Sequence, residues 1–366
     1  MPSVIHVVVT DAFAGVERYV CTVATATAAR GWKVTVVGGD PGRMRHELGP
    51  GVTWRPGATP LEAARSVMLS GRAEVCHAHM TAAEAVAVAT RRRHRGRLVS
   101  TRHFAAHRGA SRLGGLLAPW IQRHLDVEIA ISDFVADRLE RRPSVTVLNG
   151  VPDSEVLWRK ENRTVLVMQR LEPEKDTVTA LHAWAGSGLA DDGWVLRILG
   201  DGSQRAFLER LMRVEGIAGV TFAGQVRDVR QELGRAGLLL ASAPAEPFGL
   251  GVVEAMAAGV PVVAAAAGGH LETAGQVPGS VTFEPGDADS AAAGLKALAK
   301  NHAGRGRLAE AGRAWQREHA GAEATAEAVI ASYRMGRPRS GERTLVSLRG
   351  YRVGTGCLDD QVIRSG

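Results

Sequence analysis

The sequence predicts an α/β protein with two Rossmann-like, doubly wound domains. Its 366 residues are enough for two such domains with sizeable cores. At the N-terminus the apolar stretch SVIHVVVT (residues 3–10) leads through the turn DAFAGV (11–16) into a helical pattern at about 17–29, and the strand-like KVTVVGG (33–39) follows. A strand, a turn with a glycine and a helix in this order begin a doubly wound sheet. The same succession restarts near residue 164, in the second half of the chain.

The rest of the first half continues this alternation. Strands are expected in VTWRPG (52–57), EVCHAH (74–79), LVST (98–101), VEIA (127–130) and VTVLNGV (145–151), and helices in LEAARSVMLSG (61–71), the alanine-rich stretch after residue 79 and DFVADRLE (133–140). Ser132 is the expected N-cap of the last helix, because its hydroxyl can accept a hydrogen bond from the first helical turn.

The second half repeats the pattern over about 170 residues. Strands are expected in TVLVM (164–168), WVLRILGDG (194–202), VTFAGQV (220–226), GLLLASAP (237–244), VPVVAAAA (260–267) and SVTFEPGD (280–287). Helices are expected in SQRAFLERLMRVEG (203–216), from about Leu250, in DADSAAAGLKALAK (287–300) and at about 322–334. Short apolar runs that end at glycine or proline are typical of buried parallel strands.

Composition excludes several classes of protein. Apolar residues make up 45% and charged residues 23%, the balance of a globular protein rather than a disordered one. No run approaches the roughly 18 uncharged apolar residues that span a bilayer, and the N-terminus reads as a strand rather than a signal peptide. Cys21, Cys76 and Cys357 are too scattered for a disulfide framework or a metal site. We expect a cytoplasmic protein, with peripheral attachment to the inner face of the membrane left open.

The net charge of +7 is unevenly distributed. Residues 1–150 carry 20 Lys and Arg against 12 Asp and Glu, whereas residues 151–335 carry 19 against 23. A basic run in the first half contains Arg91, Arg92, Arg93, Arg95 and Arg97, followed by Arg102, Arg108 and Arg112. Such a run can bind anionic lipid or an anionic substrate, or it can be a solvated helix end. Nucleic acid is not expected as a partner, because no aromatic residues interleave the cations.

Chemistry is concentrated in AEPFGLGVVEAMAAG (residues 245–259), which follows an expected buried strand. Glu246 falls on the loop at the strand's carboxyl end, where open α/β sheets bind ligands. Phe248, Gly249 and Leu250 lead into a helix whose first N–H groups lack intrahelical partners and attract phosphate. Glu254, one turn further, can accept hydrogen bonds from vicinal hydroxyls. The alternative is a plain helix start whose carboxylates suit the helix dipole.

EPFGLGVVEAMAAGVPVVA resembles the E-x7-E signature of retaining glycosyltransferases of family four, which have the two-domain GT-B fold. The resemblance covers about residues 4–335. It implies two Rossmann-like domains facing each other across a cleft. The expected organisation is an N-terminal acceptor-binding domain (1–152), a linker (153–162), a donor-binding domain (163–335) whose last helix, about 322–335, crosses back to the first, and a flexible tail (336–366).

In the first domain the resemblance marks Gly15, with Ala14, as the pair of small residues near the donor diphosphate and the acceptor. EVCHAH is similar to the family's D-x-x-H-x-H, with Glu74 in the Asp position. Because alternate residues of a strand point to opposite faces, His77 and His79 are interpreted as structural or acceptor-lining residues rather than metal ligands. His103 matches the histidine of the family's T-x-H, close to the transferred sugar.

In the second domain Arg170 and Lys175 match the cations of the family's G-R-L-x-x-x-K-G loop, which clamp the donor diphosphate, while Gln169 and Asp176 replace its glycines. A surface Arg and Lys paired with Glu172 and Glu174 is the alternative. The resemblance also marks Gly200 of the GDG turn for close approach of the nucleotide. Val226 is expected to contact the base through its backbone.

The resemblance implies transfer of a sugar from a nucleotide-diphosphate sugar, with a UDP- or GDP-sugar expected as donor, to a glycan, lipid-linked or natural-product acceptor. The expected catalytic residues are Glu246, His103, Arg170 and Lys175; the expected donor contacts are Gly15, Arg170, Lys175, Gly200, Val226, Glu246, Phe248, Gly249, Leu250 and Glu254. No metal and no resident cofactor are expected. The alternatives are a scaffold protein that keeps the fold without transfer and a nucleotide-sugar epimerase.

Overall fold

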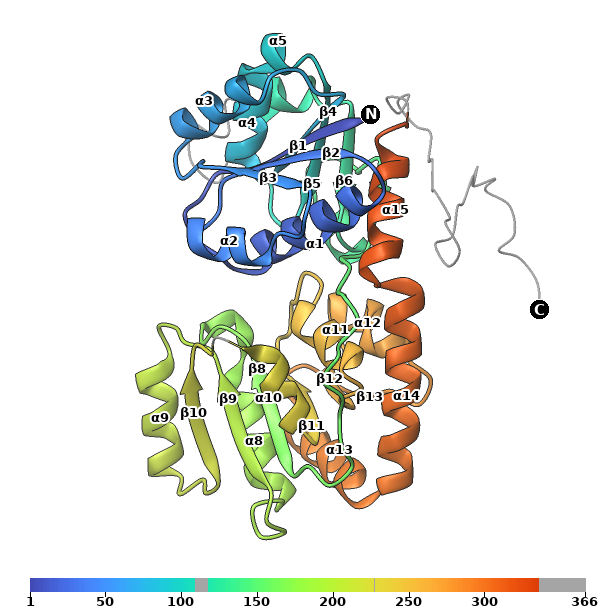
Figure 1. The fold of residues 1–366 in the computed structure, drawn as a ribbon. Helices are drawn as coiled ribbons and strands as arrows, with labels where there is room; N and C mark the ends of the chain where they lie inside the picture. Colours follow the sequence, from blue (N-terminus) through green and yellow to red (C-terminus); the bar gives the residue numbers. More distant parts are fainter. Residues whose placement is uncertain (109–117, 227, 336–366) are drawn as a thin grey trace, which may run out of the picture.

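The computed structural model of the protein describes residues 1–108, 118–226 and 228–335. It shows two α/β units placed one above the other (Figure 1), each a sheet with its helices, which we call the first and the second layer. Each contains one parallel sheet, with seven strands in the first and six in the second. The predicted fold class is therefore confirmed. Within these ranges no helix is both long and apolar enough to cross a membrane.

The first sheet has the strand order β3-β2-β1-β4-β5-β6-β7. Its strands are β1 (Ser3–Val8), β2 (Lys33–Val37), β3 (Val52–Arg55), β4 (Val75–His79), β5 (Arg97–Arg102), β6 (Val127–Ala130) and β7 (Val145–Thr146). Its helices are α1 (Gly15–Ala29), α2 (Pro41–Glu47), α3 (Pro60–Ser70), α4 (Thr81–Ala89), α5 (Arg91–His94) and α7 (Asp133–Ala136). The chain order reverses between β1 and β4, so a ligand crevice is expected at their carboxyl ends.

The second sheet repeats this order as β10-β9-β8-β11-β12-β13. Its strands are β8 (Thr164–Met168), β9 (Val195–Leu199), β10 (Val220–Gly224), β11 (Leu238–Ala241), β12 (Val262–Ala265) and β13 (Val281–Phe283). Its longer helices are α8 (Thr177–Ser187), α9 (Arg205–Val214), α10 (Val229–Arg235), α11 (Leu250–Ala257), α13 (Ala288–Lys300), α14 (His302–His319) and α15 (Ala322–Ser332); the short helices are η1 (Pro173–Lys175), α12 (Gly269–Glu272) and η2 (Ala274–Gln276). The reversal here lies between β8 and β11.

The last helix returns to the first sheet. Val329 and Tyr333 at the end of α15 are buried in the cluster that contains Tyr19 and Val20 of α1, and Figure 1 shows α14 continuing into α15 beside both layers. A further buried cluster joins Ile131 of the first layer to Phe248 of the second. The two layers thus share apolar core as well as two chain connections.

Several elements of the N-terminal half depart from the sequence expectation: β7 and α7 are shorter than expected, α1 starts earlier and α2 is additional. Helix α1 starts at Gly15 rather than Glu17, because the Glu17 carboxylate accepts the Ala14 N–H at 2.7 Å and stabilises an earlier start. Helix α2 was not expected. Its start combines Asp40, whose carboxylate accepts the Arg43 N–H at 2.7 Å, with a proline in the first turn, a common helix N-terminus.

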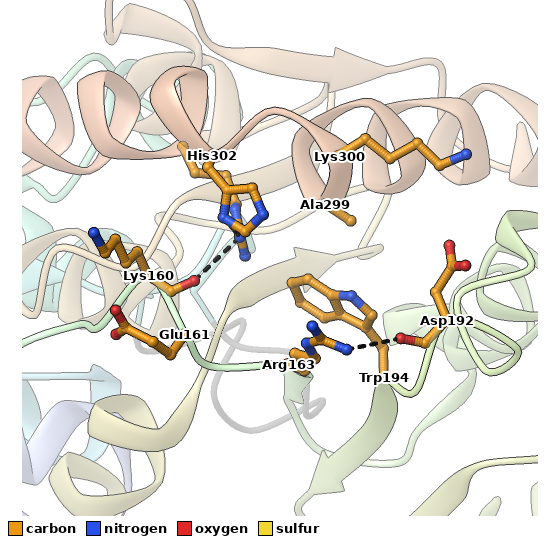
Figure 2. Close-up of a pocket in the computed structure, with 9 residues that line it drawn as sticks. Lys160, Glu161, Arg163, Asp192, Trp194, Ala299, Lys300 and His302 are labelled. Atoms are coloured by element: carbon orange, nitrogen blue, oxygen red, sulfur yellow. Dashed lines mark hydrogen bonds between the residues drawn. The ribbon is translucent and has the colours of Figure 1, made fainter.

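The two edges of the second sheet have different surroundings. The loops at its carboxyl edge contact the first layer, where the Ser132 hydroxyl donates to the Pro247 carbonyl at 2.6 Å. The amino edge faces away from the first layer. Arg163 and Trp194, which directly precede β8 and β9, line a cavity of about 620 Å³ there (Figure 2).

Candidate active site

The carboxyl ends of β8 and β11 bring Lys175 and Glu246 together. Lys175 Nζ lies 2.6 Å from Glu246 Oε2, and the two side chains are 14% and 20% exposed. They come from segments 71 residues apart in the chain, and they meet because β8 and β11 are neighbours at the point where the strand order reverses. Both side chains of this ion pair therefore keep part of their surface exposed at this edge.

The loop that carries Lys175 is held by the two residues that replace glycines. The Gln169 side-chain amide donates to the Lys175 carbonyl and the Thr177 hydroxyl, both at 2.9 Å. Asp176 has φ +46 and caps α8 with its carboxylate. Aspartate tolerates this left-handed conformation better than most residues, so the loop can form here without a glycine.

Arg170 does not join this pair. Its guanidinium lies 2.7 Å from Glu174, and both side chains are more than half exposed. The surface ion pair considered as the alternative is therefore what the structure shows for Arg170, whereas Lys175 pairs with Glu246. Glu172 instead accepts the Ser203 N–H at 3.1 Å.

The E-x7-E turn is tightly packed. Gly249 is the N-cap of α11 with φ +91, a conformation that favours glycine. The Gly269 N–H donates to the Glu246 carbonyl at 2.8 Å, and a Cβ on Gly268 would lie 2.4 Å from the same oxygen. Phe248 is 2% exposed and packs in the cluster shared with the first layer. Its side chain therefore does not line an open surface, and only its backbone remains for the predicted donor contact.

Glu254 faces the first layer. Its carboxylate lies 2.5 Å from Arg18 Nη1 of α1, and this contact raises the pKa of Arg18. Nearby, a Cβ on Gly15 would lie 3.3 Å from Leu250 Cδ1, so the first turn packs directly on the start of α11. The sequence analysis missed Arg18. Its position one turn into the helix that follows the first strand was the available signal.

A cavity of about 850 Å³ lies between the layers beside these residues. Arg18, Glu254 and Leu250 line one part, and Asp228 and Val229 line another. Val226, two residues before Asp228, packs against the core of the second sheet. Gly200 has φ +126 and lies against the Gln169 carbonyl, which a Cβ would approach to 2.0 Å. The glycine is therefore required by the loop itself.

Two further contacts fix the first layer against this site. Ser132 caps α7 as predicted, accepting the Val135 N–H at 3.0 Å, while its hydroxyl reaches Pro247 in the E-x7-E stretch. The Glu272 carboxylate accepts the N–H groups of Asp133 and Phe134 at 2.7 and 2.6 Å. These hydrogen bonds set the loop after β11 and the end of α12 against the start of α7.

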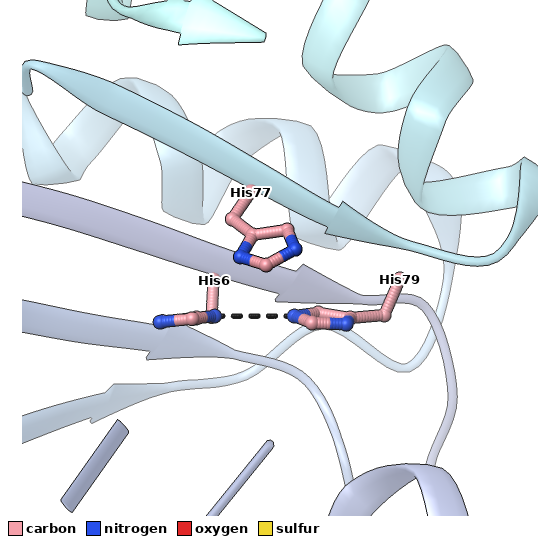
Figure 3. Close-up of side chains that lie close together, drawn as sticks. All are labelled: His6, His77 and His79. Carbon is pink, nitrogen blue, oxygen red and sulfur yellow. Dashed lines mark hydrogen bonds between the residues drawn. The ribbon is translucent and has the colours of Figure 1, made fainter. Parts of the chain in front are cut away.

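Four histidines occupy the carboxyl half of the first sheet. His77 and His79 lie on the same face, with ring centroids 4.4 Å apart, and Figure 3 shows His6 beside them. The expectation that they point to opposite faces is wrong, because residues two apart in a strand share a face. His6 escaped the sequence analysis, although the pairing of β1 with β4 places it directly opposite His77.

Three of these histidines form a hydrogen-bonded chain. His6 Nδ1 lies 3.1 Å from His79 Nε2, and His79 Nδ1 lies 3.2 Å from His103 Nε2. Burial lowers the pKa of His6 and of His103 to about 3, so both rings are neutral at pH 7. His103 is 5% exposed, and the structure does not bring it into contact with Glu246 or Lys175.

Three histidines are close enough to be considered as metal ligands. One nitrogen from each of His6, His77 and His79 lies within 4.8 Å of the others. Both nitrogens of His77 are already engaged, with the Tyr333 hydroxyl at 2.9 Å and the Thr101 hydroxyl at 2.7 Å. The present arrangement is a hydrogen-bond network in which, of the ring nitrogens of His6, His77 and His79, only His6 Nε2 lacks a partner among the described residues. Metal binding would require His77 to give up one of its partners.

Part of the predicted basic run is buried. The Arg108 side chain is 1% exposed and contacts Glu84 at 2.7 Å, Glu140 at 2.5 Å and Glu128. Arg102 contacts Glu128 and Glu140, both at 3.0 Å. Burial opposes ionisation of Glu140, but hydrogen bonds and the charges of Arg102 and Arg108 lower its pKa to about 2. These two arginines are thus unavailable to an anionic partner, because carboxylates neutralise them.

Of the remaining arginines of the run, Arg97 begins β5 and donates to the Met335 carbonyl, and the others that the structure describes lie in or just after α5. Arg91 donates to the His124 carbonyl at 3.0 Å, and Arg93 donates to the Met68 carbonyl at 3.1 Å. Arg92 and Arg95 are exposed. Arg112 lies outside the described residues, as does the predicted tail 336–366. The exposed basic surface is therefore smaller than the sequence suggested.

After Arg18 and His6, His270 is a third residue near the site that was not predicted from the sequence. It is 2% exposed and lies beside Gly249, where a Cβ would approach its Cδ2 to 3.1 Å. Burial lowers the pKa of His270, and the charge of Glu246 partly opposes this shift. The Gly268-Gly269 turn at the carboxyl end of β12 was the signal, since β12 adjoins β11 in the sheet.

Two parallel sheets of this topology, with the E-x7-E turn and Lys175 at the switch point of the second sheet, have the arrangement of the GT-B fold. Two family models match the chain: Glycosyl transferases group 1 over residues 153–315, and Glycosyltransferase Family 4 over residues 13–155. The chain belongs to the group 1 glycosyltransferases of family 4 type.

Among known proteins, a phosphatidyl-myo-inositol mannosyltransferase of Mycobacterium leprae is 30% identical over 219 residues, covering 55% of this chain and 57% of that protein. A Mycobacterium tuberculosis glycogen synthase is 28% identical over 266 residues, covering 67% and 64%. The chain covers less than two thirds of the length of these relatives. The crystal structure of Anabaena Alr3699/HepE in complex with UDP and glucose has a TM-score of 0.72 at 18% identity, over 91% of this chain and 99% of that one.

Proposed function

We propose that this chain transfers a sugar from a nucleotide-diphosphate sugar to an acceptor with retention of anomeric configuration. The observation that carries the proposal is the Lys175–Glu246 pair at the switch point of the second sheet, 2.6 Å apart and accessible. It combines a cation for the diphosphate with a carboxylate for sugar hydroxyls. Family membership supports this interpretation.

In the proposed reaction the bond between the anomeric carbon and the diphosphate oxygen breaks. The acceptor oxygen bonds to the same face of that carbon, and the acceptor proton passes to the departing diphosphate. Lys175 and the amides of Gly249 and Leu250 stabilise the negative charge of the leaving group. Arg170 joins them after leaving Glu174, a change that costs little because exposed ion pairs are weak.

Glu246 orients the donor sugar, and Glu254 accepts hydrogen bonds from the ribose hydroxyls. The ribose must then compete with Arg18, which contacts Glu254 in the structure. Val226 holds the base through its backbone. We propose a UDP- or GDP-sugar as donor; the complex of Alr3699/HepE with UDP supports the first choice. Charge neutralisation is assigned to side chains and amides, so the proposal requires no metal.

We propose that the first domain binds the acceptor, with His103 near the transferred sugar. An acceptor that is anionic or membrane-borne suits the exposed arginines of α5, and the mannosyltransferase relative is named for a phosphatidyl-inositol. Peripheral contact with an anionic membrane surface is part of this proposal.

Calorimetric titration with UDP, GDP, ADP and TDP tests the donor site. One nucleotide should bind preferentially. Glu254→Gln should lower the affinity for that nucleotide by about 10- to 100-fold, the usual effect of losing a hydrogen bond to a charged group. Glu310→Gln, an exposed change on α14, is the matched control. NMR of the product then reports its anomeric configuration. Tight nucleotide binding without transfer to any acceptor would favour the scaffold alternative, and binding of no nucleotide would contradict the donor site.

A further inference from the structure

The cavity at the amino edge of the second sheet is formed by three segments of the chain. Lys160, Glu161 and Arg163 come from the stretch before β8, Asp192 and Trp194 precede β9, and Lys300, His302 and Arg305 come from the end of α13 and the start of α14. Figure 2 shows Lys160, His302, Trp194 and Arg163 around it. The cavity lies at the opposite edge of the sheet from Glu246, so it is separate from the proposed donor site.

Arg305 is the unusual residue of this cavity. It is 1% exposed, and its contacts are the Lys160 carbonyl at 3.1 Å, His302 Nδ1 at 2.8 Å and the ring of Trp194, 5.1 Å from its guanidinium carbon. Its Nε and Nη1 have no hydrogen-bond partner among the described residues. A buried cation without a carboxylate partner is costly, so an anion from outside would stabilise it.

The other charges around the cavity leave an excess of positive charge. Lys160, Arg163, Lys300 and Arg305 are cations, while only Glu161 and Asp192 are anions. Arg163 donates to the backbone carbonyl of Asp192 at 3.2 Å rather than to its carboxylate. The excess of two positive charges matches a phosphate group, which carries about −1.5 to −2 at neutral pH.

We propose that this cavity is a binding site for a phosphate-bearing ligand, with Arg305 as its buried anchor and Arg163 and Lys300 at its mouth. The ligand is inorganic phosphate or the phosphate of a small phosphomonoester. A volume of about 620 Å³ is within the range of small-molecule sites and exceeds what a lone phosphate fills. This site is independent of the proposed transfer reaction.

Titration calorimetry and thermal unfolding with inorganic phosphate test the site, with sodium chloride at equal ionic strength as reference. Phosphate should bind and raise the melting temperature of the wild type. In Arg305→Met, and in the double variant Arg163→Gln with Lys300→Met, Kd should rise by on the order of tenfold or more, because charged hydrogen bonds are lost. The double variant changes exposed side chains, so it keeps the test valid if Arg305→Met does not fold.

Two controls locate the phosphate. Lys296→Met changes an exposed cation of α13 outside the cavity and should leave binding unchanged, as should Lys175→Met in the donor cleft. If Lys175→Met abolishes binding while Arg305→Met preserves it, the phosphate occupies the donor cleft and the proposal is wrong. Phosphate that stabilises no more than chloride also contradicts it.

A hexose monophosphate and the uncharged hexose distinguish the two ligand sources. Tighter binding of the hexose monophosphate than of inorganic phosphate, lost in the same variants, identifies a phosphomonoester site. Equal or weaker binding identifies inorganic phosphate as the ligand. The uncharged hexose should not bind at this site. If it binds to the wild type and to Arg305→Met with the same affinity, the site does not depend on a phosphate group and the proposal is wrong.

Discussion

The carboxyl edges of the two sheets have the same topology, but the polar side chains at the two edges differ in exposure. At the first edge His6, His79 and His103 are buried and neutral. At the second edge Lys175, Glu246 and Glu254 keep 14 to 20% of their side-chain surface exposed. A charged ligand can exchange places with partly exposed ion pairs, whereas it cannot reach a buried hydrogen-bonded network. This difference supports the proposal that the second edge binds the charged donor.

The buried ion cluster that includes Arg102, the last residue of β5, gives the largest expected effect on stability. Arg108→Met leaves Glu84, Glu128 and Glu140 with Arg102 as the one cation of that cluster among the described residues. Removing one member of a buried ion network lowers the free energy of unfolding by about 3–5 kcal/mol. Urea unfolding of the variant and the wild type measures this difference. Arg95→Met, an exposed change on the same layer, should have little effect. A loss under about 1 kcal/mol in Arg108→Met would mean that this edge is not held by buried charge.

The second edge should control activity. Glu246→Gln should reduce sugar transfer by about 10²–10³-fold, the usual effect of removing one group that stabilises a transition state, while nucleotide binding is retained. The measurement is kcat with the preferred donor, and Glu310→Gln serves again as the control. Transfer within a few-fold of wild type would remove Glu246 from the proposed mechanism and weaken the contrast between the edges.

The neutral histidines predict a dependence of stability on pH. A histidine of the unfolded chain titrates near 6.5, whereas His6 and His103 titrate at about 3 in the fold. Below about pH 6.5 the unfolded state binds more protons, so stability falls as pH drops from there towards about 3, by about 1.4 kcal/mol per pH unit for each histidine. Denaturant unfolding between pH 7 and 5 measures this slope.

His6→Leu should reduce that slope by about one proton, and His46→Gln, an exposed histidine, should leave it unchanged. An equal slope in wild type and His6→Leu would show that His6 gains its proton in the folded state as readily as in the unfolded chain. The buried first edge would then not be neutral.

The smallest effect is expected at the membrane surface. Replacing Arg91, Arg92 and Arg93 by glutamine should weaken binding to phosphatidylserine vesicles, by up to about 1 kcal/mol for each cation near the surface, and salt should weaken binding in the wild type. Vesicle co-sedimentation measures both. Arg91 and Arg93 already donate to backbone carbonyls. The loss of binding free energy should therefore be smaller than that expected for three cations that are free to contact the membrane. Absence of binding by the wild type at low salt would contradict the proposed membrane contact.

Much of the site could be predicted from local patterns. The stretch 245–259 follows an apolar run, and the strand-to-helix turn fixes where Glu246 and Gly249 lie, so topology alone placed them at a ligand edge. Lys175 lies in the loop after β8, so the topology likewise predicts it at the ligand-binding edge. The donor and catalytic roles of these residues stay predictions until they are measured.

Other features depended on partners distant in sequence. Arg18 and Glu254 are 236 residues apart, and no local pattern pairs them. Arg102 and Arg108 looked like exposed cations because the carboxylates that neutralise them come from other elements, α4 and β6 among them.

By itself the sequence determined the two parallel sheets, their order along the chain and the E-x7-E turn. These follow from hydrophobic periodicity and from turn residues, which act over a few neighbours. Only the tertiary structure decided which charges are buried, which histidines meet, and that Arg305 lies in a cavity where no carboxylate of the described residues pairs with it. Burial and charge pairing depend on which segments pack together, and packing brings into contact residues that no local pattern relates.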